Sequence, residues 1–330
     1  MEFIITNTDY EDLGLIHEKS YLDIDIGGTN DFVLKERLEH YDPELYSPGF
    51  VLYSLGTEYG GILNDPEIST SNGTISFTGD TFRGMLAKKI IEPPEKLAYY
   101  TISGDLNECI DELVKVHYDT LFKATGELAG VTIASWQIDR YCTLLDGIEK
   151  MLASVGYRLN IKAEYVNHEL AVVLSAEPII DHSDEVETSQ DSDVNFVIKQ
   201  YTNRYNYMIC LGSGELEARE VAYLHLLDDG TAEEITEIPA GIGVNIYVYD
   251  YTNAESREIL ISDGIKKFTE INSTDTQKMT IKDDLQLELG DIVGGRDYIT
   301  GMVIKQAITQ KIVKLQNRKL TISYKVGDGI

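Results

Sequence analysis

The chain has 330 residues, of which 43% are hydrophobic and 25% are charged, and its mean hydropathy is −0.17. Such a chain can bury real cores, and at about 100–200 residues per domain its length predicts two or three domains. It holds 28 Lys and Arg residues against 56 Asp and Glu residues, a formal net charge of −28. Because so acidic a surface repels phosphate, sequence-specific binding of DNA or RNA is disfavoured.

The sequence shows neither a secretory signal nor a long apolar run. Since no segment approaches the roughly 18 apolar residues that a membrane helix needs, we expect no membrane span. The three cysteines, Cys109, Cys142 and Cys210, are far apart and odd in number. This argues against a disulfide framework and indicates synthesis in a reducing cytoplasm.

Short β-prone runs open the chain. They are apolar and bounded by Gly, Asn and Asp, which predicts strands at residues 3–6, 50–55 and 75–78. The dipeptide Asn72-Gly73 stands between two such runs and predicts a β-hairpin. Apolar residues at helical spacing then predict a short helix over residues 82–91, which a pair of prolines closes.

Residues 101–177 predict an α/β insert of two helices followed by a hairpin. Asp105, with a Glu three residues later, forms a start like a capping box, and apolar residues at helical spacing continue to Phe122. Thr143 begins the second helix. Strict alternation of apolar residues on both sides of Asn167 then predicts two paired strands.

The rest of the chain repeats the β-rich pattern after an acidic connector. Residues 181–193 hold six acidic and no basic residues, which is typical of a solvated linker. A helical insert is expected at about 252–272, with its helix over 254–269. The predicted strands are residues 194–199, 207–211, 222–227, 244–249, 302–304, 308–315 and 320–326.

We therefore expect a mainly β fold with α/β inserts, in four parts. The parts are a first β-rich module at residues 1–100, the insert at 101–177, the acidic connector at 178–193 and a second β-rich module at 194–330. The two modules are expected to be similar, since each combines strands with an inserted α/β piece.

The most suggestive chemical motif is DIGGTN at residues 25–30. It resembles the first phosphate loop of sugar kinases with an actin-like fold, in which an Asp, two Gly and a Thr hold phosphate through backbone N–H groups. In this chain those residues are Asp25, Gly27, Gly28 and Thr29. A glycine-rich hairpin turn explains the same residues without any function, and the charged stretch that follows differs from the long hairpin such a kinase needs.

No other catalytic or metal-binding pattern stands out. The six histidines share no metal-ligand spacing, and HExxH, CxxC and Walker patterns are absent from the sequence. Cys109 and His117, on the apolar face of the first predicted helix of the insert, are interpreted as core residues. We therefore expect no catalytic residue, no metal site and no cofactor, and we do not expect an enzyme.

Four longer stretches form a recognisable pattern. They are GDTFRGMLAKKII at residues 79–91, YMICLGSGELEAREVAY at 207–223, YTNAESREILISDGIKK at 251–267 and residues 289–328, which begin LGDIVG and close on YKVGD. These stretches resemble the strand-to-helix step, the strand with its Gly-x-Gly-Glu turn, the inserted helix and the closing strands of one family. The family is that of the tail hub, or baseplate hub, proteins of siphophages and related phage-like particles, called Gp-thirty-seven-like.

The resemblance implies a homotrimer in which each subunit supplies two similar β-barrel hub domains. The barrels form a pseudo-sixfold ring that continues the hexameric tail tube, with the α/β inserts outside or below it. The implied partners are the tail tube and distal tail proteins, the tape-measure protein, a tail fibre or receptor-binding protein, and transiting DNA that is not bound specifically. The implied location is the virion tail tip, after assembly in the host cytoplasm.

The expected function is therefore that of a structural virion protein. It joins the tail tube to distal baseplate and receptor-binding components and forms part of the genome-ejection channel. Because DNA has to slide past without sticking, the acidic charge predicts a net negative channel wall. The alternatives are a sugar-kinase-like phosphotransferase and a cell-wall carbohydrate-binding module.

The end of the chain departs from the acidic average. Residues 301–330 hold six Lys and Arg residues against one acidic residue. Alternation directs Leu320, Ile322 and Tyr324 toward a core and predicts a positive stripe on the opposite face. We expect this stripe to meet the carboxylates of a neighbouring subunit. The predicted interface residues are Lys311, Lys314, Arg318 and Lys319.

Overall fold

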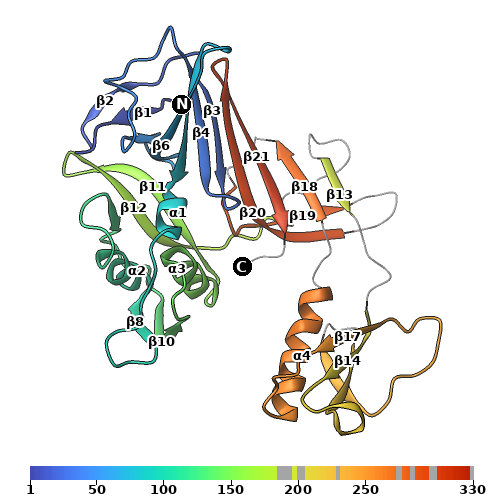
Figure 1. Cartoon of the computed structure of the whole chain (residues 1–330). Coiled ribbons are helices and arrows are strands. Elements are labelled where there is room, and N and C mark those ends of the chain that lie inside the picture. Colours follow the sequence, from blue (N-terminus) through green and yellow to red (C-terminus); the bar gives the residue numbers. More distant parts are fainter. Residues whose placement is uncertain are drawn as a thin grey trace. The chain divides into compact units, whose positions relative to one another are not determined.

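The computed structural model describes residues 1–183, 195–198, 205–227, 231–272, 277–282, 287–296 and 303–327. The chain divides into two compact units (Figure 1). Unit 1 consists of Met1–Phe196 and Lys278–Ile330, and unit 2 consists of Val197–Gln277. The fold is mainly β, as the sequence predicted. No helix in the described ranges has the length and apolar character needed to cross a membrane.

Unit 1 is built on one large sheet. Its described strands follow the order β13-β18-β21-β20-β3-β4-β7-β6-β5-β1-β2, and β19 pairs with β20. The strands are β1 (Ile4–Thr6), β2 (Asp12–Leu15), β3 (Tyr21–Ile26), β4 (Asp31–Arg37), β5 (Val51–Tyr53), β6 (Gly60–Ser69), β7 (Thr74–Thr81), β13 (Asn195–Ile198), β18 (Gln277–Lys282), β19 (Ile292–Arg296), β20 (Val303–Gln316) and β21 (Lys319–Gly327).

Strand β3 shows how the sequence builds this sheet. Leu22 and Ile24 are fully buried, while Asp23 and Asp25 alternate with them on the other face. Buried residues from β1, β3, β4, β5, β6, β7 and β20 all join one core. Because so many strands contribute to the same core, the sheet curls around it.

The sheet brings the beginning and the end of the chain together. Strand β20 pairs antiparallel with β3, which places Val313 opposite Ile24 and Lys314 opposite Asp23. Strand β21 pairs along the other side of β20, through a turn at Asn317 and Arg318 that lies where the sequence predicted it. The expected first and last modules therefore share strands of a single sheet, and their arrangement as two barrels stays a prediction.

The hairpin and the helix predicted near the N-terminus are both present, but their bounds differ from the predicted ones. Strands β6 and β7 form the predicted hairpin, and Gly73 adopts a φ of 62° in its turn. Helix α1 (Phe82–Ala87) is shorter than predicted, because the chain leaves it to form a bridge between Ile90 and Thr143. Thr81 caps the helix by accepting a hydrogen bond from the Gly84 N–H at 3.2 Å.

The α/β insert contains the predicted helices and hairpin, together with three strands that the sequence did not predict. Its elements are β8 (Tyr100–Asp105), α2 (Leu106–Lys115), β9 (Phe122–Ala124), β10 (Thr132–Ile138), α3 (Leu144–Ala153), β11 (Tyr157–Val166) and β12 (Glu169–Pro178). Strands β11 and β12 pair across the turn at Asn167, as predicted. Their core continues into α1 and β5, so the insert and the sheet belong to one body.

The prediction that one helix extends to Phe122 is wrong. Helix α2 ends at Lys115, and Leu121 and Phe122 instead lead into β9, which pairs in parallel with β12. Their burial produced an apolar periodicity that continued past the end of the helix. His117 therefore lies beyond the helix and only partly buried, rather than on its apolar face.

Unit 2 is a four-stranded sheet with one long helix. Its elements are β14 (Tyr207–Leu211), the 3₁₀ turn η1 (Leu216–Ala218), β15 (Val221–Leu226), β16 (Ala232–Ile235), β17 (Ile246–Asp250) and α4 (Arg257–Asn272). The strand order is β16-β15-β14-β17, with β14 and β17 parallel. The helix lies where it was predicted: Phe268 is fully buried against this sheet, and Ile261 and Ile265 pack around the same core.

The acidic connector lies largely outside the described residues, which resume at residue 195. At its described start, Asp181 forms a bridge to Ile292 of β19 and an ion pair with Lys305 at 2.5 Å. Both contacts attach the end of the insert to the large sheet.

The carboxylate of Asp105 is predicted to stabilise the α/β insert, and this can be tested. Its carboxylate accepts hydrogen bonds from the N–H groups of Asn107, Ala129 and Gly130 at 2.9, 2.9 and 2.8 Å. Burial alone raises the pKa of Asp105, but these donors outweigh it and hold the pKa below its ordinary value. We expect Asp105→Ala to lower the free energy of unfolding at pH 7 by about 1–2 kcal/mol in urea titrations.

The matched control is Asp111→Ala on the same helix, where an exposed ion pair with Lys115 contributes about 0–1 kcal/mol. Since the folded pKa of Asp105 is lowered, its stabilisation is complete at neutral pH and is lost as the pH falls through that value. The difference in free energy of unfolding between wild type and Asp105→Ala should therefore become smaller at acidic pH. A difference in free energy of unfolding that does not change with pH would contradict the stabilising role of the ionised Asp105 carboxylate.

Candidate functional site

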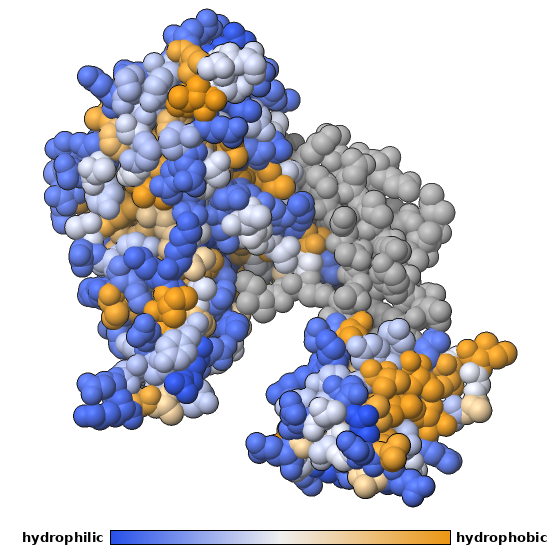
Figure 2. Space-filling model, viewed as in Figure 1, coloured by the Kyte–Doolittle hydropathy of each residue, from blue (hydrophilic) through white to orange (hydrophobic). Residues whose placement is uncertain are grey.

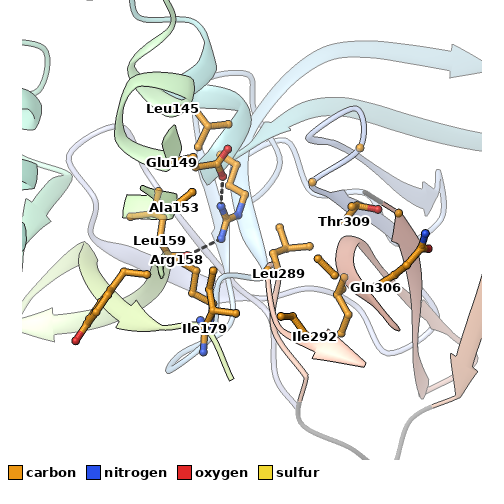
Figure 3. A pocket seen from close by; sticks show the side chains of 18 of the residues that line it. Leu145, Glu149, Ala153, Arg158, Leu159, Ile179, Leu289, Ile292, Gln306 and Thr309 are labelled. Atoms are coloured by element: carbon orange, nitrogen blue, oxygen red, sulfur yellow. Dashed lines mark hydrogen bonds and ion pairs between the residues drawn. The ribbon is translucent and has the colours of Figure 1, made fainter. Parts of the chain in front are cut away.

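A cavity of about 780 Å³ lies in unit 1 between the α/β insert and the large sheet. In Figure 3, Leu145, Glu149 and Ala153 of α3 lie on one side of it, and Leu289 and Thr309 lie on the other. Its walls are mostly apolar, but charged side chains cluster around its base. This cluster is the strongest concentration of buried charge among the described residues, and it joins the insert to the sheet.

Arg83 of α1 is the centre of the cluster, with only 4% of its surface exposed. Its Nε donates to Glu58 at 3.0 Å. Its Nη1 donates to Glu149 at 2.6 Å and its Nη2 donates to the Leu159 carbonyl at 2.9 Å, which are the dashed lines at these two residues in Figure 3. These partners belong to the β5–β6 turn, α3 and β11. One guanidinium therefore holds together three elements besides its own helix.

Burial and charge act in opposite directions at this cluster. Burial alone lowers the pKa of Arg83, but the negative charges of Glu58 and Glu149 outweigh it and raise the pKa. Burial raises the pKa of Glu149, and the charge of Arg83 opposes that shift only in part. Arg83 is therefore a permanent cation at neutral pH.

Lys311 of β20 extends the cluster into the sheet. Its ammonium forms an ion pair with Glu288 and lies 3.8 Å from a carboxylate oxygen of Glu58. The same ammonium lies 5.5 Å from the ring centroid of Tyr59 and 5.8 Å from that of Tyr324. Since Glu58 lies between Lys311 and Arg83, the two cations share one carboxylate.

The expectation that Lys311 lies on an exposed stripe is wrong. The side chain is buried, with 1% of the residue exposed. The cause is the period of a strand: residues two apart share a face, so the alternation that directs Val313 into the core also directs Lys311 inward.

The other three predicted interface residues are on the surface, and two of them pair with acidic residues of their own chain. Lys314 forms an ion pair with Asp23 at 2.9 Å, and Arg318 pairs with Glu18. Lys319 is exposed at the start of β21. The stripe is therefore carried by Lys314, Arg318 and Lys319, and its contact with another subunit stays a prediction.

A second polar joint lies beside the same cavity. Asp291, which is 2% exposed on its side chain, accepts a hydrogen bond from Nε of Arg158 at 3.1 Å. It also accepts from the N–H groups of Ile180 and Glu288 at 3.1 and 3.0 Å. Arg158 belongs to β11, so this joint ties the insert to the chain segment that enters β19.

The DIGGTN motif forms the turn between β3 and β4 and does not present its N–H groups. The Gly27 N–H donates to the Asn30 side chain at 2.7 Å, and the Gly28 N–H donates to Asp25 at 3.1 Å. A Cβ on Gly27 would lie 2.4 Å from the Thr309 carbonyl oxygen, so glycine is required by close packing against β20. The N–H groups of both glycines, which would take part in holding a phosphate, are therefore already bonded within the turn.

The cysteine thiols lie in surroundings that favour their neutral, unreactive form. Burial raises the pKa of the Cys109 thiol, and that of Cys210 to about 11. Within the described ranges, no group of three or more His, Cys, Asp or Glu side chains is arranged to hold a metal ion.

The sequence did not predict the charged cluster, although its central residue lies in one of the four stretches that resemble hub proteins. Arg83 lies inside the GDTFRGML stretch, directly after the helix cap and between apolar residues. A charged residue at a core position of a short helix was the available signal. Its partners Glu58 and Glu149 come from distant segments, and nothing local connects them.

Comparison with known proteins identifies the fold and no family. No family model and no curated protein matches the chain. Solved structures of tail proteins do share its fold. The prophage MuSo2 43 kDa tail protein of Shewanella oneidensis has a TM-score of 0.54 at 12% identity, with 99% of this chain and 98% of that chain covered.

Two further tail proteins are similar over nearly the whole chain. The prophage tail protein gp18 of Listeria monocytogenes EGD-e has a TM-score of 0.51 at 11% identity, with coverage of 98% of this chain and 94% of that one. A tail protein of Neisseria meningitidis MC58 has a TM-score of 0.50 at 12% identity, with 99% and 97% covered. The chain therefore has the fold of phage-type tail proteins, and the Gp-thirty-seven-like assignment stays a prediction.

The charged cluster can be tested by removing its central cation. We expect Arg83→Met to lower the free energy of unfolding by about 3–5 kcal/mol, because Glu149 would remain buried without its cation and Glu58 would keep only the more distant Lys311. The matched control is Lys88→Met at the end of the same helix, where an exposed ion pair with Asp80 contributes about 0–1 kcal/mol. Equal losses in the two variants, measured by urea unfolding, would contradict the role of Arg83.

Proposed function

We propose that the chain is a non-enzymatic structural component of a phage-type tail, and that it acts as the tail-tip or baseplate hub. The observation that carries the proposal is the shared fold, which extends over 98–99% of this chain in three tail proteins from different bacteria. The four stretches that resemble hub proteins support the same role from the sequence. The hub joins the tail tube to distal baseplate and receptor-binding parts.

In this proposal the hub is a homotrimer with pseudo-sixfold symmetry, built from two similar barrel-like parts in each subunit. The curled sheet of unit 1 supports a ring subunit, since strands from both ends of the chain surround one core. The partners are the tail tube, the tape-measure protein and a fibre or receptor-binding protein. The site of action is the virion tail tip.

The net charge supports a channel through which DNA passes. A chain with a formal charge of −28 can line a ring with carboxylates. DNA binds proteins largely because Lys and Arg displace counterions from its phosphates, so a wall with few Lys or Arg would not hold the DNA. We therefore infer a net negative channel wall. The exposed cations Lys314, Arg318 and Lys319 then lie at the subunit interface rather than in the channel.

The direct test is the mass of the purified chain. Light scattering should give about three times the 37.0 kDa of one chain at micromolar concentration. The same sample should bind no ATP in calorimetry, since the N–H groups of the DIGGTN turn are occupied. A monomer at all concentrations, or micromolar ATP binding, would contradict the proposal.

The interface is tested by reversing the stripe. Lys314→Glu, Arg318→Glu and Lys319→Glu together should leave a folded chain that assembles slowly or stays monomeric, and ~0.5 M salt should slow assembly of the wild type by screening. The matched control reverses Lys96, Lys115 and Lys150, which are exposed elsewhere in unit 1. Assembly of the stripe variant at the wild-type rate would show that these residues do not form the interface.

A further inference from the structure

The sheet of unit 2 has one covered face. Residues on this face are fully buried beneath α4, against Leu260 and Phe268. They are Met208 and Cys210 of β14 and Ala222 and Leu224 of β15. Tyr247 and Tyr249 of β17 pack around the same core. The sheet and its helix therefore form two layers.

The opposite face of the sheet is apolar and lacks a covering element among the described residues of the unit. Strand register places Ile235, Tyr223, Ile209 and Val248 in one row across the four strands. Glu233, His225, Tyr207 and Ile246 form the next row, and Val221 and Leu211 follow with Asp250. We call this surface the open face. Val248 is 54% exposed and Ile246 is 42% exposed, and Figure 2 shows hydrophobic side chains gathered over this unit.

The strand sequences indicate that the open face is normally covered. Strands β14 (YMICL) and β17 (IYVYD) run parallel and are apolar on both faces, which is the pattern of strands buried between two layers. A strand with one face in solvent alternates apolar and polar residues instead. Contiguous exposed apolar surface of this kind marks a binding site.

The charge of unit 2 indicates what kind of partner the open face would bind. Glu233 and Asp250 stand at opposite corners of the open face, and their side chains are 55% and 57% exposed. Asp250 already forms an ion pair with Arg219 at 2.5 Å and Glu233 lies 3.8 Å from His225, so the argument from charge rests on the unit as a whole. A second copy of this face is a poor match because both copies would carry the same net negative charge. Unit 2 as a whole holds 14 acidic and 6 basic residues. The partner that fits is apolar at its centre and basic at its flanks.

We propose that the open face binds an amphipathic helix of a partner protein, whose apolar stripe is flanked by Lys or Arg. A helix is the matching element because its apolar stripe can cover one face of a sheet, as α4 already does on the other face. Five-residue strands span about 17 Å, which corresponds to a helix of about 11 residues. The proposal does not depend on the role in a tail.

The experiment uses the full chain and a defined probe. The probe is a fluorescent 14-residue synthetic helix with a leucine stripe flanked by lysines, and its counterpart carries glutamates at the lysine positions. Fluorescence anisotropy should show binding of the lysine peptide that is about tenfold or more tighter than that of the glutamate peptide, and weaker in high salt. Val248→Glu on the open face should weaken binding of the lysine peptide by about tenfold or more.

Two controls keep the outcome clear. Ile259→Glu introduces the same charge at an exposed apolar position of α4, away from the open face, and should bind the lysine peptide as the wild type does. Hydrogen exchange should show slower exchange of the β17 amides when the peptide is present than in the free chain, with circular dichroism confirming that both variants fold.

Three results would overturn the proposal. They are equal affinity for the two peptides, unchanged binding by Val248→Glu, and strong protection of β17 in the free chain with no peptide binding. The last result would mean that another part of the chain covers the open face. The light-scattering mass is a separate measurement, so a failed trimer and a failed helix site are distinguishable.

Discussion

The structure of unit 1 depends on one buried guanidinium. Arg83 donates to Glu58, Glu149 and the carbonyl of Leu159, and these groups belong to three elements that the chain reaches at widely separated points. Removing a charge of this kind leaves its partners buried and uncompensated, which is far more costly than breaking a surface pair. The α/β insert therefore cannot separate from the sheet without exposing or stranding these charges.

Lys311 continues the same network into the last long strand. It contacts Glu58 and Glu288, so the cations of α1 and β20 are linked through a shared carboxylate. The joint between Arg158 and Asp291 also ties the insert to the segment before β19, beside the same cavity. Polar contacts thus join the beginning, the middle and the end of the chain around the cavity, in addition to the apolar cores. These contacts make unit 1 a single compact body, which suits the role proposed for the chain.

Local signals predicted most helices and the hairpins, because capping residues such as Asp105 and turn residues such as Gly73 act through neighbouring backbone. Strands β3 and β4 were missed, since charged residues interrupt their apolar period, on the outer face of β3 and in the second half of β4. The pairing of β3 with β20 joins residues about 290 positions apart, and no local pattern encodes it. Lys311 was misplaced for a different reason, because its charge was given more weight than its position in the strand period.

The most direct measurement for the central claim is native-state hydrogen exchange across unit 1. If the charged cluster makes the insert and the sheet one body, the slowest amides of α3, β11 and β20 should exchange with the same free energy of opening, and should lose protection together in rising urea. If α3 and β11 open at much lower urea while β20 stays protected, the insert is an independent unit. That result would contradict the account.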